Sequence, residues 1–196
     1  MRRWAHTAAN WLYRPWTRNL QLGLHSTVGK PRLLSGAEFI QIGSGCHIRE
    51  GAWLGVYPQP NEAYPAHRPH IVLEDGAYMG FYACLTAIDL VHIGAGSVIS
   101  DYFYASDHTH ELDPRKGSPA SQPLVSKGPV RIGRNCIIGY RVSILPGVVL
   151  GDSCVVGAHA VVTKSFPAMT MLVGAPARVI KRFDLSDGCW KNVTSG

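Results

Sequence analysis

Aliphatic residues recur at every sixth position through much of the second half of the chain. The series is Ile132, Ile138, Ile144, Leu150, Val156 and Val162. The residue after each is often glycine, and the residue four positions after each is apolar and mostly small: Cys136, Val142, Val148, Cys154, Ala160 and Phe166. A helix repeats every 3.6 residues and a strand every 2, so neither element alone produces this period. It predicts a coil of three short strands and three turns, in which the aliphatic residue points inward, glycine permits the turn and the small residue fills a corner.

The same period occurs upstream, with two interruptions. Its inward positions there are Ile42, Ile48, Leu54, Leu73, Met79, Leu85, Ile93 and Ile99, with a slip of two residues before the last pair. Residues 56–70 and about 105–129 are rich in proline and aperiodic, and loops this long in a compact repeat are usually functional. We therefore predict an N-terminal cap segment over residues 1–34, a coil over 35–166 with protruding loops at 56–70 and 105–129, and a C-terminal extension over 167–196.

Charge and cysteine content narrow the possible functions. The chain of 196 residues has a net charge of +6 but no cluster of five or more basic residues, so a nucleic-acid partner is not expected. Its five cysteines are odd in number and form no CxxC pair, which argues against a disulfide framework or structural zinc and favours a cytoplasmic setting. No apolar run approaches the length of a membrane span.

The first 22 residues lack the period and combine three tryptophans, at positions 4, 11 and 16, with four arginines. Repeat proteins need a cap on their first coil, so a short helical cap is the favoured interpretation of this segment. The alternative is a peripheral contact with a membrane, because basic and aromatic side chains also suit the membrane interface. Pro15 limits the length of any single amphipathic helix here.

The six-residue period, the stretch VVTKSFPAMTMLVGAPARVIKRF and the segment SDHTHELDP together resemble the hexapeptide-repeat acyltransferases. Within that family the chain is similar to the maltose and galactoside O-acetyltransferases and to related enzymes that acetylate polysaccharides, over roughly residues 35–183. The resemblance implies an all-β fold, the left-handed parallel β-helix. It also implies a homotrimer that holds acetyl-CoA, its cosubstrate, in clefts between neighbouring subunits.

Acetyl transfer to a hydroxyl needs a general base, and histidine suits this role because its pKa lies near working pH. Continuing the period places the next inward position at Ala105. In the enzymes that the chain resembles, the catalytic histidine lies five residues after such a position, in a motif His-x-(Ile/Leu)-Asp-Pro, which points to His110. His108 is the alternative base, and a third possibility is that both are merely polar loop residues. Asp107, Asp113 or a backbone carbonyl could orient the ring.

The resemblance also assigns six residues to acetyl-CoA. Two match positions whose backbone groups meet the pantetheine arm, two match contacts near the nucleotide end and two would meet phosphates as cations. In that order they are Tyr140, Ala158, Thr163, Lys164, Arg178 and Lys181. Any single lysine or arginine is as readily a solvated surface charge, but their joint occurrence in this frame favours CoA binding.

At three positions the sequence differs from the residues that the family uses around its ligands. Ile137 stands where many relatives have tryptophan, and Gly80 and Ala87 stand where the maltose and galactoside enzymes hold the acceptor with asparagine and aspartate. The acceptor pocket is therefore expected to differ. The loop at residues 56–70 is a candidate lining, because its aromatic and basic side chains suit a sugar: Tyr57, Tyr64, His67 and Arg68. An ordinary proline-rich loop explains this segment equally well.

Other functions of the same fold remain open. A zinc-dependent carbonic anhydrase needs a His-x4-His pair, whereas this chain has His-x-His at 108/110 and His-x2-His at 67/70, so no metal is expected. A non-enzymatic trimeric scaffold needs neither the histidine loop nor the CoA positions, and an antibiotic O-acetyltransferase is the closest alternative. The favoured prediction is an acetyl-CoA-dependent O-acetyltransferase that acts, by direct attack, on a sugar hydroxyl of a free saccharide or a surface-polysaccharide precursor.

Overall fold

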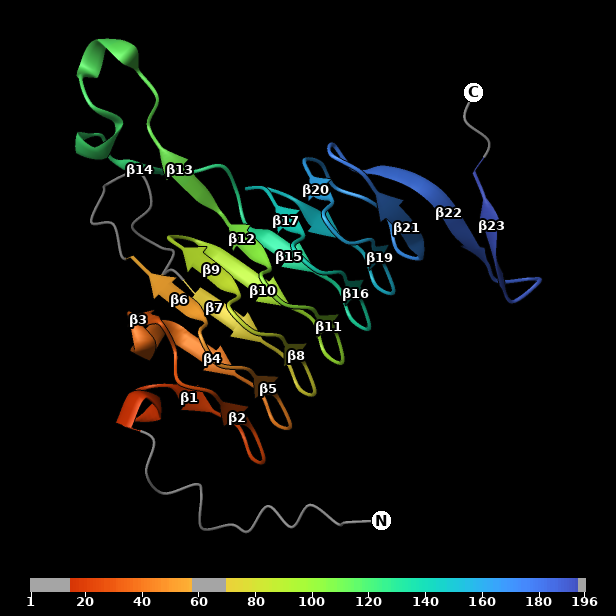
Figure 1. Ribbon diagram of the computed structural model, residues 1–196, viewed down its shortest axis with the longest axis horizontal. Coiled ribbons are helices and arrows are strands. Elements are labelled where there is room, and N and C mark those ends of the chain that lie inside the picture. Colours follow the sequence, from red (N-terminus) through yellow and green to blue (C-terminus); the bar gives the residue numbers. More distant parts are fainter. Residues whose placement is uncertain (1–14, 58–69, 194–196) are drawn as a thin grey trace.

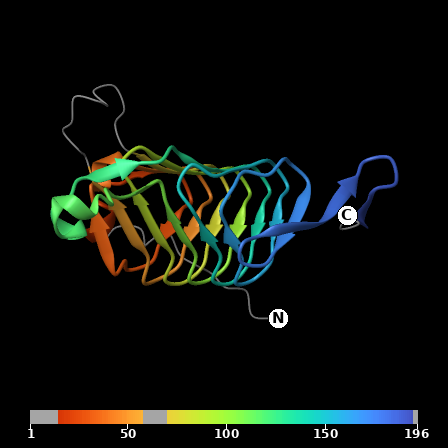
Figure 2. The same cartoon turned by 90° about the horizontal axis from the view of Figure 1, so that it is seen from above.

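Three parallel β-sheets form the sides of a long coil. The computed structural model describes residues 15–57 and 70–193, and the chain forms the left-handed parallel β-helix that the resemblance implies. The backbone passes through sheet A, sheet B and sheet C in turn and then starts the next coil (Figures 1 and 2). Among the described residues, helical structure is limited to four 3-10 turns: η2 (Pro15–Thr17), η3 (Ala37–Phe39), η4 (Pro114–Lys116) and η5 (Pro119–Ser121).

The strands of each sheet come from successive coils. Sheet A contains β1 (Gln21–Leu22), β4 (Ile40–Ile42), β7 (His70–Leu73), β10 (Leu90–Ile93), β15 (Val130–Ile132) and β18 (Val149–Leu150). Sheet B contains β2 (Thr27–Val28), β5 (His47–Ile48), β8 (Tyr78–Met79), β11 (Val98–Ile99), β16 (Ile137–Ile138), β19 (Val155–Val156), β21 (Thr170–Val173), β22 (Arg178–Asp184) and β23 (Cys189–Asn192). Sheet C contains β3 (Leu33–Ser35), β6 (Trp53–Val56), β9 (Cys84–Ala87), β12 (Tyr104–Ser106), β17 (Ser143–Ile144) and β20 (Val161–Val162).

The strands stack so that the predicted inward positions lie above one another. In sheet C, Ala105 pairs with Leu85 on one side and Ile144 on the other. In sheets A and B, Ile93 and Ile99 pair with inward residues of the coils on both sides. All five side chains are fully buried, and burial of such apolar columns is the main force that holds the coils together. The six-residue register, including its continuation across the slip to Ala105, is confirmed.

The glycines after the inward positions have a different role from the predicted one. The left-handed backbone conformation that turns the chain falls two residues later, often on residues other than glycine, such as Asn135 (φ 52°) and His159 (φ 61°). Gly133 does not adopt it, but a Cβ atom there would lie 2.6 Å from the backbone nitrogen of Asp152 in the next coil. Glycine is therefore needed at this corner because neighbouring coils approach closely.

The coil begins earlier than expected. Strands β1, β2 and β3 pair in parallel with β4, β5 and β6, so residues 21–35 form a first coil, of which all but Ser35 lies in the segment expected to be a cap, residues 1–34. Trp16 packs against the core here, and its indole N–H donates to the carbonyl oxygen of Val28 (3.3 Å). The helical cap or membrane contact predicted for the first residues, with Trp4 and Trp11, lies largely outside the described residues. No helix in the described parts of the chain is long and apolar enough to span a membrane.

The C-terminal extension continues sheet B. Strand β21 pairs in parallel with β19, and β22 and β23 then add as antiparallel strands. The hairpin of β22 and β23 projects beyond the last coil (Figure 2). The side chains of Phe183 and Trp190 meet edge to face across it, with ring centroids 5.4 Å apart. Sheet B thereby becomes the largest sheet, with nine strands.

Candidate active site

One long segment leaves the coil between its fourth and fifth turns. The chain exits after β12, forms the antiparallel pair β13 (His108–His110) and β14 (Leu124–Ser126) with η4 and η5 between them, and re-enters at β15. We refer to residues 107–129 as the excursion, which projects at the upper left of Figure 1. It starts two residues later than predicted, because Ala105 and Ser106 still pair in sheet C. Both candidate histidines lie on β13.

A buried carboxylate ties the excursion to the preceding coil. The side chain of Asp107 is fully buried and accepts hydrogen bonds from the backbone N–H groups of Ile88 (3.0 Å) and Asp89 (2.7 Å). These two residues are the ones that break the six-residue register before β10. Backbone donors that are shielded from water need partners, so the carboxylate satisfies the N–H groups of these two partly buried residues and fixes the point at which the excursion begins.

His108 belongs to this buried anchor. Its Nδ1 lies 2.7 Å from Oδ1 of Asp107, and only 9% of its side chain is exposed. A carboxylate can only accept, so Nδ1 carries the proton. The hydroxyl of Ser106 lies 3.3 Å from the same nitrogen. The three side chains are therefore not a Ser-His-Asp triad, because in a triad the serine and the carboxylate bind opposite ring nitrogens.

His110 is exposed and is held differently. Its Nδ1 lies 3.1 Å from the backbone carbonyl oxygen of Gln122, on the returning side of the excursion. A carbonyl can only accept, so Nδ1 donates and Nε2 keeps its lone pair, which is the form that a general base requires. Of the orienting groups that the sequence left open for His110, the structure shows the carbonyl. Asp113 instead forms hydrogen bonds with Arg115, with Oδ1–Nε and Oδ2–Nη2 distances of 2.9 and 2.8 Å.

The residue that supplies this carbonyl was missed by sequence reasoning. Gln122 is 6% exposed, although its neighbours in the excursion from residue 114 to residue 121 are all exposed. Its side chain bonds to backbone groups of Asp113 and Gly117. A lone glutamine between proline-rich stretches carries no periodic signal, so only the three-dimensional structure reveals it.

The two residues that the resemblance matches to the pantetheine arm lie side by side. Tyr140 and Ala158 occupy equivalent turns between sheets B and C in successive coils, and the backbone N–H of His159 donates to the carbonyl of Tyr140 (2.7 Å). Thr163 and Lys164 follow β20 at the next corner and are exposed. The Nζ atom of Lys164 lies 5.8 Å from the ring centroid of Phe166.

A β-bulge sets the direction of the two predicted phosphate ligands. Arg178 pairs with Val173 and Lys181 pairs with Met171, with a register shift between these two pairs. Val173 and Met171 are two residues apart on β21, so their side chains lie on the same face of the sheet. Arg178 and Lys181 therefore share that face, which residues three apart on a regular strand would not do. Both cations are thus brought together beside the last coil.

Comparisons with known proteins agree with this architecture. The family described as bacterial transferase hexapeptide (six repeats) matches residues 129–164. A candidate acetyltransferase of Mycobacterium tuberculosis, Rv3034c, is 31% identical over 188 residues, which are 91% of this chain and 61% of that protein. A candidate lipopolysaccharide biosynthesis O-acetyl transferase of Escherichia coli, WbbJ, is 30% identical over 127 residues, which are 62% of this chain and 65% of that protein.

The chain contains the bacterial transferase hexapeptide repeat at residues 129–164 and is similar to these two relatives over 91% and 62% of its length. It spans less than two thirds of the length of these two relatives. Among solved structures, AntD, an N-acyltransferase from Bacillus cereus in complex with dTDP and 3-hydroxybutyryl-CoA, has a TM-score of 0.69 at 19% identity, covering 84% of each chain. At this identity, AntD supports the fold alone.

The positions that depart from the family pattern differ in their surroundings. Ala87 is fully buried and cannot reach a ligand. Gly80 makes room for Asp101, whose carboxylate accepts from the backbone N–H of Phe81 (2.8 Å). Tyr57 lies closer to the histidines, with its ring centroid 6.4 Å from that of His108. Tyr64, His67 and Arg68, the other predicted members of an acceptor lining, lie outside the described residues.

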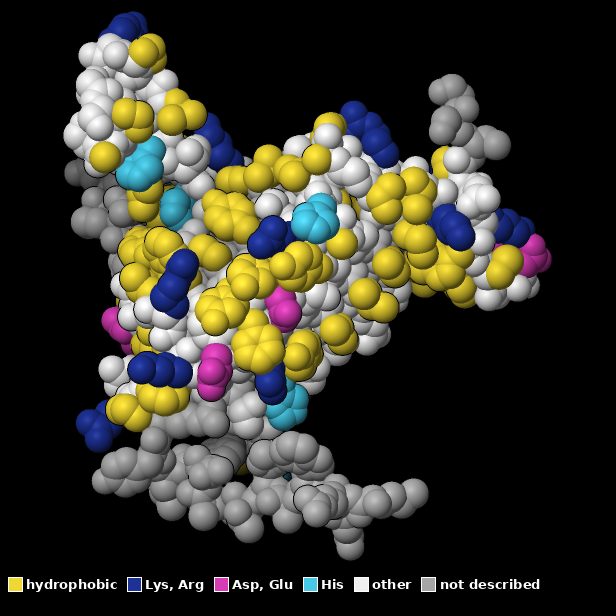
Figure 3. Space-filling view, in the orientation of Figure 1, with side chains coloured by type: hydrophobic (Ala, Val, Ile, Leu, Met, Phe, Trp, Pro, Cys, Tyr) yellow, Lys and Arg dark blue, Asp and Glu magenta, His cyan; other side chains and the backbone are white. Residues whose placement is uncertain are grey.

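An aromatic row runs along the corner between sheets B and C, with one ring per coil. Ring centroids lie 5.2 Å apart between Tyr82 and Tyr102, 5.6 Å between Tyr102 and Tyr140, and 5.5 Å between Tyr140 and His159. The guanidinium of Arg141 lies 5.2 Å from two of these rings. On the neighbouring outer face of sheet B, Val98, Ile137, Val155 and Met171 form an apolar stripe in register, and Ile137 is 53% exposed. Figure 3 shows hydrophobic side chains gathered over the middle of the coil.

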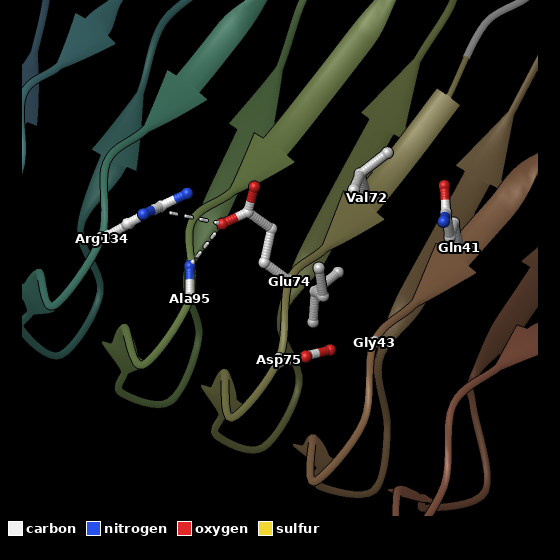
Figure 4. A pocket seen from close by; sticks show the side chains of 8 residues that line it. Gln41, Gly43, Val72, Glu74, Asp75, Ala95 and Arg134 are labelled. Carbon is white, nitrogen blue, oxygen red and sulfur yellow. Dashed lines mark hydrogen bonds and ion pairs between the residues drawn. The ribbon is translucent and has the colours of Figure 1, made fainter.

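A shallow pocket lies on the outside of sheet A, and a cluster of charged side chains centred on Glu74 lines part of it (Figure 4). Glu74 accepts from the backbone N–H of Ala95 (3.0 Å), and its carboxylate also lies 3.1 Å from Nε2 of His92 and 3.7 Å from Nε of Arg134. The Ala95 hydrogen bond, followed by the nearby charges of His92 and Arg134, lowers the pKa of Glu74. These contacts join three successive coils. Among the described residues, no group of three or more His, Cys, Asp or Glu side chains is placed to hold a metal ion.

Proposed function

We propose that this protein is an acetyl-CoA-dependent O-acetyltransferase that acetylates a hydroxyl of a saccharide or a surface-polysaccharide precursor, with His110 as general base. The single observation that carries the proposal is the state of His110 in a chain that contains the hexapeptide repeat. Its ring is exposed, Nδ1 is occupied by a carbonyl, and Nε2 is left to accept a proton. His108 is the weaker candidate, because its ring is almost buried and belongs to the Asp107 anchor.

The proposed chemistry is a direct transfer. Nε2 of His110 accepts the proton of the acceptor hydroxyl while the oxygen attacks the carbonyl carbon of the thioester. The carbon–sulfur bond then breaks, the sulfur leaves with the electron pair and takes a proton from the imidazolium, and an acetyl ester and the thiol of CoA result. This route needs no covalent enzyme intermediate and no metal.

The CoA positions support acetyl-CoA as the donor. Tyr140 and Ala158 lie on adjacent coils, which suits the extended pantetheine arm, and the bulge in β22 brings Arg178 and Lys181 to one face for phosphate groups. Thr163 and Lys164 would meet the nucleotide end. We assign the chain to the cytoplasm, where acetyl-CoA is available and where its five free cysteines, three of them buried in the core, stay reduced.

We infer that the protein acts as a homotrimer. The apolar stripe on sheet B and the aromatic row beside it form a long exposed hydrophobic surface, and such surfaces usually pack against a partner. Because Tyr140 belongs to the aromatic row, the same packing would place a neighbouring subunit beside the bound CoA. Sedimentation equilibrium tests this inference, and a monomer at micromolar concentration contradicts it.

The experiment that tests the function is release of free thiol from acetyl-CoA in the presence of candidate acceptors. The panel contains free sugars, nucleotide sugars, and aminoglycoside and streptogramin drugs. The name of WbbJ, a lipopolysaccharide biosynthesis relative, favours saccharide acceptors, so turnover is expected with sugars or nucleotide sugars. Turnover with a drug alone would replace the proposal by an antibiotic O-acetyltransferase, and no acetyl-CoA binding would replace it by a scaffold.

A further inference from the structure

The backbone on both sides of the excursion is fixed around His110. In the pairing of β13 with β14, His110 lies opposite Leu124, and the next backbone N–H, of Glu111, donates to the carbonyl of Pro123 (2.8 Å). The carbonyl of Gln122 then receives Nδ1–H of His110 at 3.1 Å. This carbonyl comes just beyond the paired strands, so the ladder of β13 and β14 does not by itself determine where it points.

The side chain of Gln122 supplies the contacts that hold this carbonyl in place. Its Oε1 accepts from the backbone N–H of Asp113 (3.0 Å), and its Nε2 donates to the carbonyls of Asp113 (2.9 Å) and Gly117 (3.1 Å). Its own backbone N–H donates to the carbonyl of Pro119 (3.1 Å). The amide thus forms two opposed hydrogen bonds with one residue on the outgoing side, as a neighbouring strand would. It connects the outgoing and returning halves of the excursion where the strand pairing has ended.

The connection matters for the protonation state of His110. A histidine in water favours the tautomer with the proton on Nε2, which is the wrong form for a base that acts through Nε2. A carbonyl held against Nδ1 selects the other tautomer. The nearby carboxylates are engaged elsewhere, since Asp107 bonds to His108 and Asp113 bonds to Arg115. The carbonyl of Gln122 is therefore the group that sets the tautomer, and the side chain of Gln122 determines its position.

We propose that Gln122 is the positioning residue of His110: its buried side-chain amide holds the excursion closed so that its own backbone carbonyl keeps the proton of His110 on Nδ1. The proposal rests on the role of His110 in the proposed function. Its structural part, the link between Gln122 and the tautomer of His110, holds independently of the acceptor and of the reaction.

The test compares the wild type with Gln122→Met and Gln122→Asn, with Ser121→Ala as the matched control. Methionine keeps the volume and removes all three side-chain hydrogen bonds, whereas asparagine keeps the amide on a shorter stem. Ser121→Ala removes a neighbouring hydrogen bond of the same loop, from Oγ to the carbonyl of Ser118 (2.7 Å), without touching the contacts of Gln122. Thermal denaturation of each variant establishes that the coil remains folded.

The first readout is the tautomer of His110, from imidazole 15N shifts of histidine-labelled protein at a pH where the ring is neutral. The wild type is expected to show the proton on Nδ1, and Gln122→Met is expected to shift His110 towards the Nε2–H form. His108 provides an internal control, because Asp107 holds its Nδ1 proton independently of Gln122. Spectra of His110→Ala and His108→Ala assign the two rings.

The second readout is steady-state kinetics with the best acceptor from the panel. Gln122→Met is expected to lower kcat about 10- to 100-fold, since a misplaced catalytic group can cost about 100-fold. The KM for acetyl-CoA should stay within about twofold, as expected for a change confined to catalysis. Gln122→Asn should lie between wild type and Gln122→Met, and Ser121→Ala should match wild type.

Three results would overturn the proposal: a wild-type His110 with its proton on Nε2, a Gln122→Met protein whose His110 tautomer is unchanged, or a Gln122→Met protein with wild-type kcat. If no acceptor supports turnover, the proposed function fails, while the 15N shifts still decide whether Gln122 sets the tautomer. The two failures are therefore distinguishable.

Discussion

The coils and the excursion of this protein are built on different principles. In the coils, position along the sequence determines structure, because every sixth residue is inward and stacks on its equivalents above and below. In the excursion, a few polar side chains determine the structure: Asp107 at its base and Gln122 just beyond the paired strands. The comparison indicates that stability resides mainly in the repeated part, whereas the irregular part holds the group that we propose for the chemistry.

The two histidines of β13 show the same contrast within three residues. His108 is nearly buried and is held by a buried carboxylate, whereas His110 is exposed and is held by a backbone carbonyl. Both rings therefore carry a proton on Nδ1 and a lone pair on Nε2. They differ in access, which favours His110 as the residue that meets a substrate.

The largest expected effect on stability comes from the coil core. Ile138→Ala removes a fully buried side chain that stacks between Ile99 and Val156, and should lower the free energy of unfolding by about 2–5 kcal/mol. The matched change in the excursion, Leu112→Ala, removes a side chain that is 70% exposed and should cost less than about 0.5 kcal/mol. Chemical denaturation measures both. Equal losses would contradict the assignment of stability to the coils.

The next largest loss of stability is expected where the excursion leaves the coil. Asp107→Ala leaves the backbone N–H groups of Ile88 and Asp89 without their carboxylate partner. A buried donor without a partner costs about 1–3 kcal/mol, and because these two donors are only partly buried we expect a combined loss of roughly 2–4 kcal/mol by denaturant titration. Asp113→Ala removes a carboxylate whose hydrogen bonds go to Arg115 within the excursion, one of them the cap of η4, and should cost less stability than Asp107→Ala. An Asp107→Ala protein as stable as wild type would show that the slip does not need this anchor.

The smallest effect is pH-dependent and belongs to the surface of the coil. Because the pKa of Glu74 is lowered in the folded state, its contribution is present above the unfolded pKa, near 4.3, and is lost as pH falls through the folded pKa. Glu74→Gln should therefore cost a few tenths of a kcal/mol to about 1 kcal/mol at pH 7, and less at about pH 2.5. Thermal melts at both pH values test this, with the exposed Glu38→Gln as control. A loss that is equal at both pH values would rule out the ionised carboxylate as its source.

The sequence determined the coils far better than the excursion. The period of six is a local sequence signal, and every coil carries it again. The register of the strands, and the point near Ala105 at which the chain leaves the coil, could therefore be predicted. The roles of Asp107 and Gln122 could not be predicted, because both bind backbone groups of residues that the fold brings near them. The shared face of Arg178 and Lys181 depends on a bulge that only strand pairing defines. The sequence also showed the corner glycines. The reason that glycine is needed there, the close approach of the next coil, appears only in the stacked structure.

The measurement that tests the central claim most directly is the kcat of His110→Ala beside that of His108→Ala, in the thiol-release assay with the best acceptor. Loss of a general base costs about 10²–10⁴ in rate, and we expect a loss of this size for His110→Ala, with the oligomeric state and acetyl-CoA binding of the wild type retained. His108→Ala should retain more activity, because we propose that His108 holds the base of the excursion rather than meeting the substrate. Near-wild-type turnover by His110→Ala, together with an inactive but folded His108→Ala, would contradict the account.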